Sequence, residues 1–433
     1  MSITKTSSER VAACAVDPQS PLAASQSGNT GLAVATPVWT RGDTIRTSIA
    51  VLIIVALLVT SNIIGNLPEF GTNASTSLLI GTALGIAFER GRFCFFCIFR
   101  DGLQRRFNSG LLAIFTAIAV GSIGYTVLYG LFLPAPGNGA LPSVAHIGPV
   151  SWALVLGATA FGIGMPLAGA CISGQFYRLS QGYLRAIPGL IGVIIGFILS
   201  FNSWNFLYEN SIKDAPKLWL PDAIGYSGSL VLTLVVLGAL SFWAIKSANQ
   251  KELFKPSNST YEWPTVRHNL IKRRWSPFAT GAIIGIVGVA AYLRIEPLGT
   301  TRQLNTIAQD ISNRLDLSPK MIGLDGLSGC VGAAVETITN NGWLVIGLLV
   351  AAVAASVSGN RFKPQWPTLK GTASSLIGGA LLGWGSFTSL GCTIGNLLSG
   401  TQAFAVSGWV FFLFAFLGTW LGLKLKLDKW GNG

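Results

Sequence analysis

The sequence contains few charged residues and almost no histidine. Only 11% of its 433 residues are charged, and it has two histidines and three methionines. Half of the residues are hydrophobic, and the mean hydropathy is +0.55. A soluble domain of this length needs far more charge to cover its surface. The scarcity of charge therefore excludes a soluble protein and predicts an all-α polytopic membrane protein.

Several kinds of catalytic motif are also missing. The sequence has no phosphate-binding glycine loop, no nucleophile elbow and no haem or flavin signature. His146 and His268 fall in predicted loops, so a histidine metal site inside the membrane is excluded. A site built from thiolates alone stays open as an alternative, because Cys94 and Cys97 form one C-x2-C pair. We expect no cofactor and no ATP-driven transport within this chain.

The charge that is present is strongly basic. There are 30 Lys and Arg against 17 Asp and Glu, a net charge of +13. In so apolar a chain this excess is typical of loops that face anionic lipid, and it does not indicate nucleic acid. Seven basic residues lie in 246–275, whereas 134–150 has no Lys or Arg and 206–223 has two. The positive-inside rule places 246–275 and both termini in the cytoplasm of a bacterial inner membrane.

Ten apolar stretches have about the length that a bilayer requires. We expect spans near 44–65, 75–90, 110–133, 151–167, 185–205, 224–245, 277–296, 341–358, 371–387 and 404–424. Residues 1–40 are rich in small and polar residues and predict a disordered cytoplasmic tail. The chain then divides into a first transmembrane half, 41–245, a basic linker, 246–275, and a second half, 276–433.

Four further apolar pieces are too short to cross a membrane. They lie near 93–107, 169–181, 326–338 and 389–400, and each is rich in glycine or flanked by it and starts near a cysteine. Backbone that stops partway through a bilayer is tolerated only where it lines a cavity or is buried in protein. We therefore expect four re-entrant half-helices on a solute path.

The order of spans and short pieces in 75–205 recurs in 277–424, starting from the opposite side of the membrane. Both units also share the pattern G-x-G-x6-C-x2-G, which ends in Cys171 and Gly174 in the first and in Cys392 and Gly395 in the second. Order, orientation and motif together predict an inverted repeat.

The first short piece brings cysteine and arginine together. Cys94 and Cys97 lie three residues apart, between Arg90 and Arg100. Guanidinium groups beside a half-helix attract anions, while Glu89 and Asp101 would keep the arginines paired when no solute is bound. The alternative is simple anchoring, because Lys and Arg flank membrane spans routinely.

Cys171 and Cys392 follow glycine at points where a helix is expected to break and restart. Free backbone N–H groups at a helix start favour an anion. These thiols, with Arg178 nearby, could thus hold a negatively charged sulfur compound, and Cys330 has a similar glycine-rich setting. Packing is the alternative for any one cysteine, but it gives no reason for cysteine on four discontinuous segments.

These residues resemble the YeeE/YedE family of sulfur-transport proteins. The matching stretches are Gly85 to Arg90 through Phe93 and Cys94, with Phe99 to Asp101, then Leu167 to Cys171 with Gly174 and Arg178, then Leu390 to Cys392 with Gly400. The arrangement looks most like the longer YedE-type members over residues 75–424. The resemblance implies uptake of thiosulfate or a related species, with Cys94, Cys171 and Cys392 in the central path. Gly-Ala-Cys replaces the usual Gly-Gly-Cys at 169–171, and Cys97 stands where a small residue is expected.

The sequence thus predicts a transporter, not an enzyme, for a small sulfur-containing anion. The predicted path runs past Cys392 and Cys330, then Cys171, Cys94 and Cys97, to Arg90, Arg100 and Arg178. Two alternatives stay open: a selenium compound or other soft solute, and a membrane sulfurtransferase that uses cysteine persulfides. We expect no sulfur-carrier domain fused to the chain, so any such partner would be a separate cytoplasmic protein.

Overall fold

The computed structural model describes residues 39–430, except residues 69, 106–107, 134–135, 138, 143, 248–266, 268–269, 325–330 and 333–337. Within these residues the protein is built of helices, and the pairing of extended segments is limited to two isolated bridges, Tyr183 with Gln365 and Trp219 with Ala405. The predicted all-α class is confirmed. Almost all of the predicted tail, most of the basic linker and the piece around Cys330 lie outside the described residues.

Long helices lie at all ten places where the sequence predicts a span. They are α2 (Arg41–Asn66), α3 (Gly71–Gly91), α5 (Ser109–Phe132), α6 (Trp152–Ala168), α8 (Ala186–Leu207), α9 (Leu220–Ser247), α11 (Pro277–Arg294), α13 (Asn340–Ser358), α14 (Leu369–Thr388) and α15 (Val406–Lys424). Some of their starts carry side-chain caps: the Thr40 and Asp43 side chains form a capping box at α2, and Ser276 caps α11 just before Pro277.

Not every one of these helices is apolar enough to count as a span by composition. Among the described residues, eight pass this test, or nine if α14 and the following short helix, bent by 44°, are one span. Helix α14 falls short by itself, and α3 falls short because threonine, serine and asparagine fill its first turns and Glu89 and Arg90 its last. The protein is a multi-pass membrane protein, and the figure of ten spans stays a prediction.

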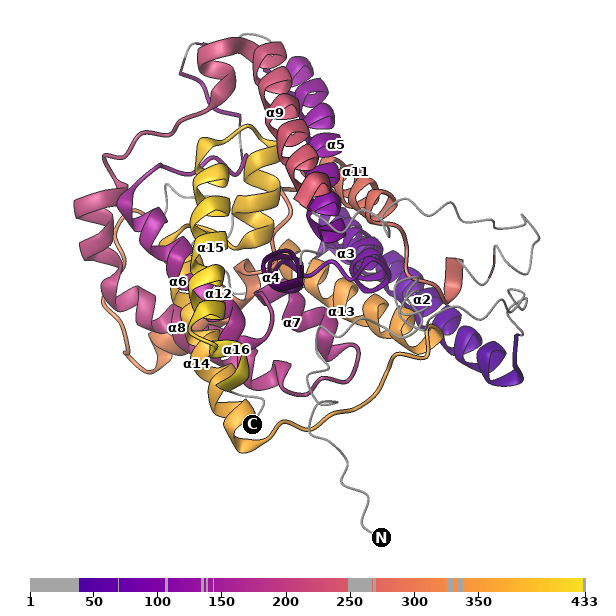
Figure 1. The fold of residues 1–433 in the computed structure, drawn as a ribbon. Coiled ribbons are helices and arrows are strands. Elements are labelled where there is room, and N and C mark those ends of the chain that lie inside the picture. The colour runs from indigo at the N-terminus through magenta and orange to yellow at the C-terminus, as the bar shows by residue number, and fades with distance from the viewer. Residues whose placement is uncertain are drawn as a thin grey trace.

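Shorter helices occupy three of the four places where half-helices are expected. These are α4 (Phe95–Arg105), α7 (Ile172–Leu179) and the π-helix η5 (Thr393–Gly400). Further helices in the described part of the chain are η2 (Tyr208–Ile212), α12 (Arg302–Arg314) and α16 (Leu427–Trp430). In Figure 1, α4 and α7 lie near the centre of the molecule, between the long helices.

The long helices pack in two groups, each drawn from both halves of the chain. In one group α3 packs on α13 and α5 on α11, with α2 and α9 at the outside; in the other α14 packs on α6 and α8, and α15 packs on α6. Glycine permits this close packing, because a side chain at Gly85 would collide with the Leu348 carbonyl and one at Gly196 with the Ala380 carbonyl.

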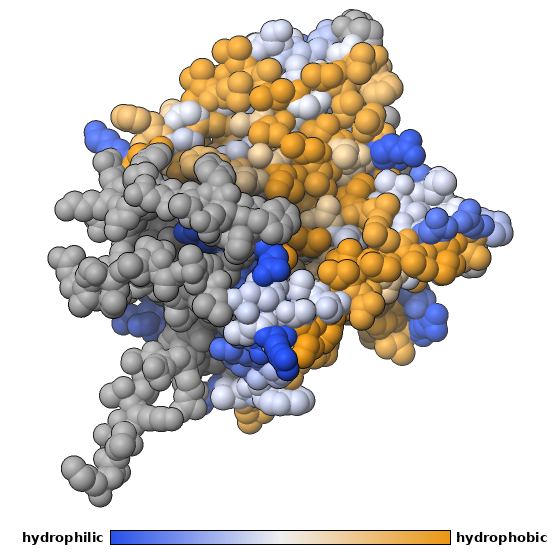
Figure 2. All heavy atoms as spheres, turned by 90° about the vertical axis from the view of Figure 1, so that its right-hand side faces the viewer, coloured by the Kyte–Doolittle hydropathy of each residue, from blue (hydrophilic) through white to orange (hydrophobic). Residues whose placement is uncertain are grey.

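The surface of the bundle is largely apolar. Figure 2 shows a broad hydrophobic face with hydrophilic side chains toward its margins. On α2, for example, Leu52 is 68% exposed and Val51 55% exposed. An exposed apolar surface of this extent requires lipid as solvent.

Candidate functional site

Cys171 occupies the point where one helix ends and another begins. Helix α6 ends at Ala168, the backbone reverses through Gly169 at φ +77°, and Cys171 is the N-cap residue of α7. Glycine tolerates this left-handed conformation at no steric cost. The predicted break and restart at this position are therefore confirmed.

The Cys171 sulfur is surrounded by hydrogen-bond donors. It accepts the Gly174 backbone N–H at 3.4 Å, lies 3.3 Å from the Ser173 hydroxyl and accepts the Phe95 backbone N–H. The Cys94 and Cys171 side chains are also hydrogen-bonded to one another. Donors that converge on one buried sulfur, at the positive end of a helix, form a site that suits an electron-rich group.

Gly174 keeps space open beside both sulfurs. A Cβ atom at this position would lie 2.7 Å from Cys94 Sγ and 3.3 Å from Cys171 Sγ. Both cysteines carry thiols and are buried. The glycine of the C-x2-G motif thus has a steric reason: it lets two thiols from different short helices meet.

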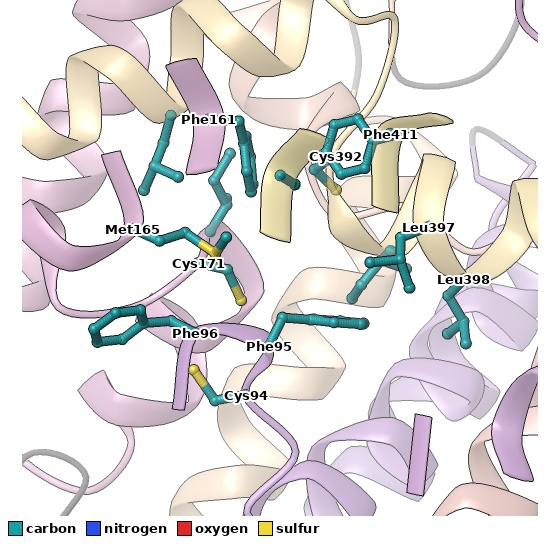
Figure 3. Close-up of a cluster of buried hydrophobic side chains, with 14 of the residues drawn as sticks. Cys94, Phe95, Phe96, Phe161, Met165, Cys171, Cys392, Leu397, Leu398 and Phe411 are labelled. Carbon is teal, nitrogen blue, oxygen red and sulfur yellow. The ribbon is translucent and has the colours of Figure 1, made fainter. Parts of the chain in front are cut away.

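Cys392 holds the equivalent place in the second half of the chain. It is the N-cap residue of η5, it carries a thiol, and it is fully buried. Its Sγ lies 3.7 Å from the Thr300 hydroxyl. Figure 3 shows Cys392 in the same buried cluster as Cys94, Cys171 and Met165, so three cysteines that are far apart in the sequence lie in one region of the core.

A histidine secures the loop that carries Cys392. His146 Nε2 lies 2.8 Å from Asn396 Oδ1, and Asn396 donates in turn to the carbonyls of Ser389 and Gly391. Because the amide group uses its N–H donors on these carbonyls, its oxygen accepts the histidine proton. Burial lowers the pKa of His146 to about 4, so the ring is neutral near pH 7.

Arginines gather around a buried glutamate at the end of α3. Arg361 forms a forked ion pair with Glu89, with Nε–Oε1 at 2.6 Å and Nη2–Oε2 at 3.0 Å. Arg274 Nη1 lies 3.4 Å from Glu89 Oε1, and Arg90 Nε lies 3.8 Å from Glu89 Oε2. We call Glu89, Arg90, Arg274 and Arg361 the glutamate hub. It joins α3 to the segment before α11 and to the α13–α14 loop, and it carries excess positive charge.

The other predicted arginines are close to this region of the chain. Arg100 forms an ion pair with Asp101 at 2.9 Å, and Arg178 Nη2 donates to Cys97 Sγ at 2.9 Å. The pairing of arginines with Glu89 and Asp101 agrees with the sequence prediction. Cys97 differs from it, because this residue is disulfide-bonded and does not present a thiol.

Some predicted site residues are brought together and others are not described. The structure groups Cys94 with Cys171 and places Arg178 and Arg90 on adjoining segments, whereas Cys330 lies outside the described residues. Among the described residues, no group of three or more His, Cys, Asp or Glu could hold a metal ion.

Sequence reasoning missed Arg274, Arg361, His146 and Thr300. In the sequence, both arginines look like ordinary basic residues that anchor the ends of spans, and His146 looks like an ordinary loop residue. Thr300 gave the one available signal, because it is a polar residue shortly after a predicted span. Its contact with Cys392 was not predictable, because the two residues are 92 positions apart in the sequence.

A helical bundle with an apolar surface and short helices buried in its core defines a multi-pass membrane protein, and short helices of this kind are typical of transporters. A family model described as "Sulphur transport" matches residues 90–421. The chain belongs to this family.

Named relatives agree with that assignment. "Thiosulfate transporter TsuA" of Escherichia coli K12 is 27% identical over 80% of this chain and 92% of its own length. The protein of the same name from Spirochaeta thermophila is 27% identical over 80% of this chain and 96% of its own. "Probable transporter YedE" of E. coli K12 is 29% identical over 40% of each chain. The relatives are named as transporters, as predicted, and the likeness to YedE covers the smaller share.

Proposed function

We propose that this protein takes up thiosulfate, or a closely related sulfur-containing anion, through a path lined by Cys392, Cys171 and Cys94. The observation that carries this proposal is the cluster of three buried thiols, two of which begin short helices. Thiols can donate weak S–H hydrogen bonds to a soft anion without forming a stable covalent bond. The names of the TsuA relatives support thiosulfate as the substrate.

The packing of helices supports an inverted repeat in which 75–205 and 277–424 are equivalent. Under this repeat α3 corresponds to α11, α5 to α13, α6 to α14 and α8 to α15. The contact of α3 with α13 then has its equivalent in α11 with α5, and α8 with α14 has its equivalent in α15 with α6. We propose that the path runs along the axis that relates the two units.

We further propose that the glutamate hub faces the cytoplasm of a bacterial inner membrane, with both termini on that side. The distribution of Lys and Arg supports this orientation. An anion released past Cys94 would then meet Arg90, Arg178 and Arg100, whose charge attracts it. A separate sulfur-carrier protein could accept it there.

The test is growth of a bacterium that lacks sulfate uptake and depends on thiosulfate as its sole sulfur source. We expect growth with the wild-type protein and none with Cys171→Ala, Cys392→Ala, when both proteins are present in the membrane in equal amounts. Full growth of the double variant would contradict the thiol path. Failure of the wild-type protein to support growth would favour a selenium compound or another soft solute.

Gly174→Ala tests the path without removing a thiol. Its Cβ would lie 2.7 Å from Cys94 Sγ, so we expect uptake of radiolabelled thiosulfate to fall roughly tenfold, because small displacements at a positioned site are costly. Gly238→Ala is the matched control, since no atom lies within 4 Å of a Cβ there. Equal uptake by the two variants would contradict the proposal.

A membrane sulfurtransferase is the second candidate, and the donors around the Cys171 sulfur favour it, because such a site could stabilise a persulfide. In this reaction a cysteine thiolate attacks the outer sulfur of thiosulfate, the S–S bond of thiosulfate breaks and sulfite leaves. The persulfide is a stable adduct of about 32 Da on the protein during turnover, detectable by intact-mass analysis. Uptake with no adduct would favour the transporter.

A further inference from the structure

A groove lies where α2 enters the membrane, well separated in sequence from the cysteines. It has a volume of about 510 Å³ and is lined by Trp39, Thr47, Val51, Leu52, Arg267 and Ile271, among others. In Figure 1, α2 is at the right-hand side of the molecule, and Figure 2 views the protein from that side. No step of the proposed transport path uses these residues.

Two polar atoms in the groove are buried and have no hydrogen-bond partner among the described residues. They are Thr47 Oγ1 and Arg267 Nε. Buried donors are almost always satisfied in proteins, and leaving one without a partner costs about 1–3 kcal/mol. Two such atoms on residues that line one groove leave hydrogen-bonding capacity that a ligand with acceptor groups can satisfy.

The charge of the groove selects an anion. The Arg267 guanidinium lies over the Trp39 ring at 4.0 Å, which fixes its plane. The nearby carboxylate of Asp43 is engaged with Lys272 at 2.5 Å and with the Thr40 side chain. Asp43 therefore does not neutralise Arg267, and a planar guanidinium held in this way suits a phosphate group.

The opposite end of the groove selects an apolar chain. Leu52 lies roughly one and a half turns, about 7 Å, along α2 from Thr47, and Val51 and Leu52 are more than half exposed. Tryptophan and basic residues at this level are typical of the boundary between headgroups and acyl chains. An occupant must then carry an anionic head and an apolar tail.

We propose that this groove is a binding site for one anionic phospholipid. The phosphate accepts hydrogen bonds from Arg267 and Thr47, and an acyl chain lies against Val51 and Leu52. The groove shares no residue with the thiol path, so loss of lipid binding and loss of thiosulfate uptake can be measured separately. The competing occupants are a soluble phosphate compound and another segment of this same chain.

The test compares delipidated protein in detergent micelles that contain phosphatidylcholine, with and without phosphatidylglycerol. We expect phosphatidylglycerol to raise the apparent melting temperature of the wild-type protein, and native mass spectrometry to detect one retained phosphatidylglycerol molecule. Arg267→Gln should weaken this lipid binding roughly fivefold, the effect of one cation near an anionic surface. Arg41→Gln is the control, because it removes the same charge from an exposed position outside the groove.

A second variant and a soluble phosphate compound extend the test. Thr47→Val preserves the shape of the side chain and should weaken lipid binding roughly threefold, as expected for one neutral hydrogen bond. Equal responses of wild type and Arg267→Gln to phosphatidylglycerol would overturn the proposal. So would equal stabilisation by soluble glycerol 3-phosphate, which would reveal an anion site without lipid, or the absence of any lipid response.

Discussion

The breaks at Cys171 and Cys392 have similar backbones and different chemistry around them. Each cysteine caps a short helix after a residue in the left-handed conformation, Gly169 at φ +77° and Leu390 at φ +61°. The first break lies near the glutamate hub and contacts a second thiol, whereas the second is set among uncharged groups, including Thr300 and the His146–Asn396 pair. The fold therefore supplies the same helix start twice, and the surrounding side chains make one basic end and one neutral end.

The largest effect is expected from removing the Glu89 carboxylate, which holds the basic end together. Glu89→Gln leaves Arg90, Arg274 and Arg361 buried without their counter-charge, and breaking a buried ion pair in this way costs about 3–5 kcal/mol. We expect a loss of this size in the free energy of unfolding, measured by denaturant titration in micelles. Asp310→Asn breaks an exposed ion pair in which Arg314 Nε lies 2.9 Å from Asp310 Oδ1, and it should cost about 1 kcal/mol or less.

A loss for Glu89→Gln no larger than for Asp310→Asn would contradict the structural importance of the hub. The basic end would then differ from the neutral end only in its charge.

At the neutral end, stability should depend on pH through His146. Its pKa is lowered from 6.5 to about 4, so between these values the unfolded chain binds the proton and the folded protein does not. Stability therefore falls as the pH drops from about 6.5 to about 4, by up to about 3 kcal/mol, and is unaffected by this group above 6.5. The measurement is apparent melting temperature against pH, wild type beside His146→Gln.

Glutamine can donate to Asn396 without titrating, so His146→Gln should lack the part of the acid loss that comes from this residue. Identical pH curves for the two proteins would show that the neutral end does not depend on a neutral histidine.

The two breaks should also differ in uptake. Cys171→Ala removes a sulfur that is bonded to several donors, so we expect the initial rate of radiolabelled thiosulfate uptake to fall roughly 100-fold, as for the loss of strong hydrogen bonds to a charged ligand. Cys392→Ala should reduce it roughly tenfold, because the Thr300 hydroxyl and neighbouring amide groups remain. Equal losses would mean that the chemical difference between the two ends has no role in transport.

Both helix starts and the positions of the long helices could be predicted from sequence, because local signals specify them. Glycine and proline before Cys171, and the repeated spacing before Cys392, predict both helix starts, and long apolar stretches locate all ten long helices. These features depend on residues a few positions apart. Helix α3 is a partial exception, because its polar residues weaken the apolar signal. It tolerates them because it is largely buried in protein.

The partners at each end could not be predicted, because they come from distant parts of the chain. Arg361 lies 272 positions from Glu89, and His146 lies 250 positions from Asn396. Arginine at the end of a span usually serves as an anchor, so its residue type alone does not reveal a buried ion pair. Likewise, nothing near Cys97 in the sequence separates a disulfide from a thiol.

The smallest expected effect concerns the backbone that the two breaks share. Gly169→Ala adds a Cβ 3.5 Å from Arg178 Nη1, which is an ordinary contact, so its cost is the left-handed conformation alone, about 1–2 kcal/mol. Leu390 already adopts that conformation in the second half, so the fold tolerates it there, and we expect Gly169→Ala to retain uptake. Gly42→Ala, with no positive φ and its nearest neighbour at 3.8 Å, is the unstrained control. A collapse of uptake in Gly169→Ala with normal stability would mean that glycine at the basic end provides space for the solute, and that the two breaks differ in backbone as well as in side chains.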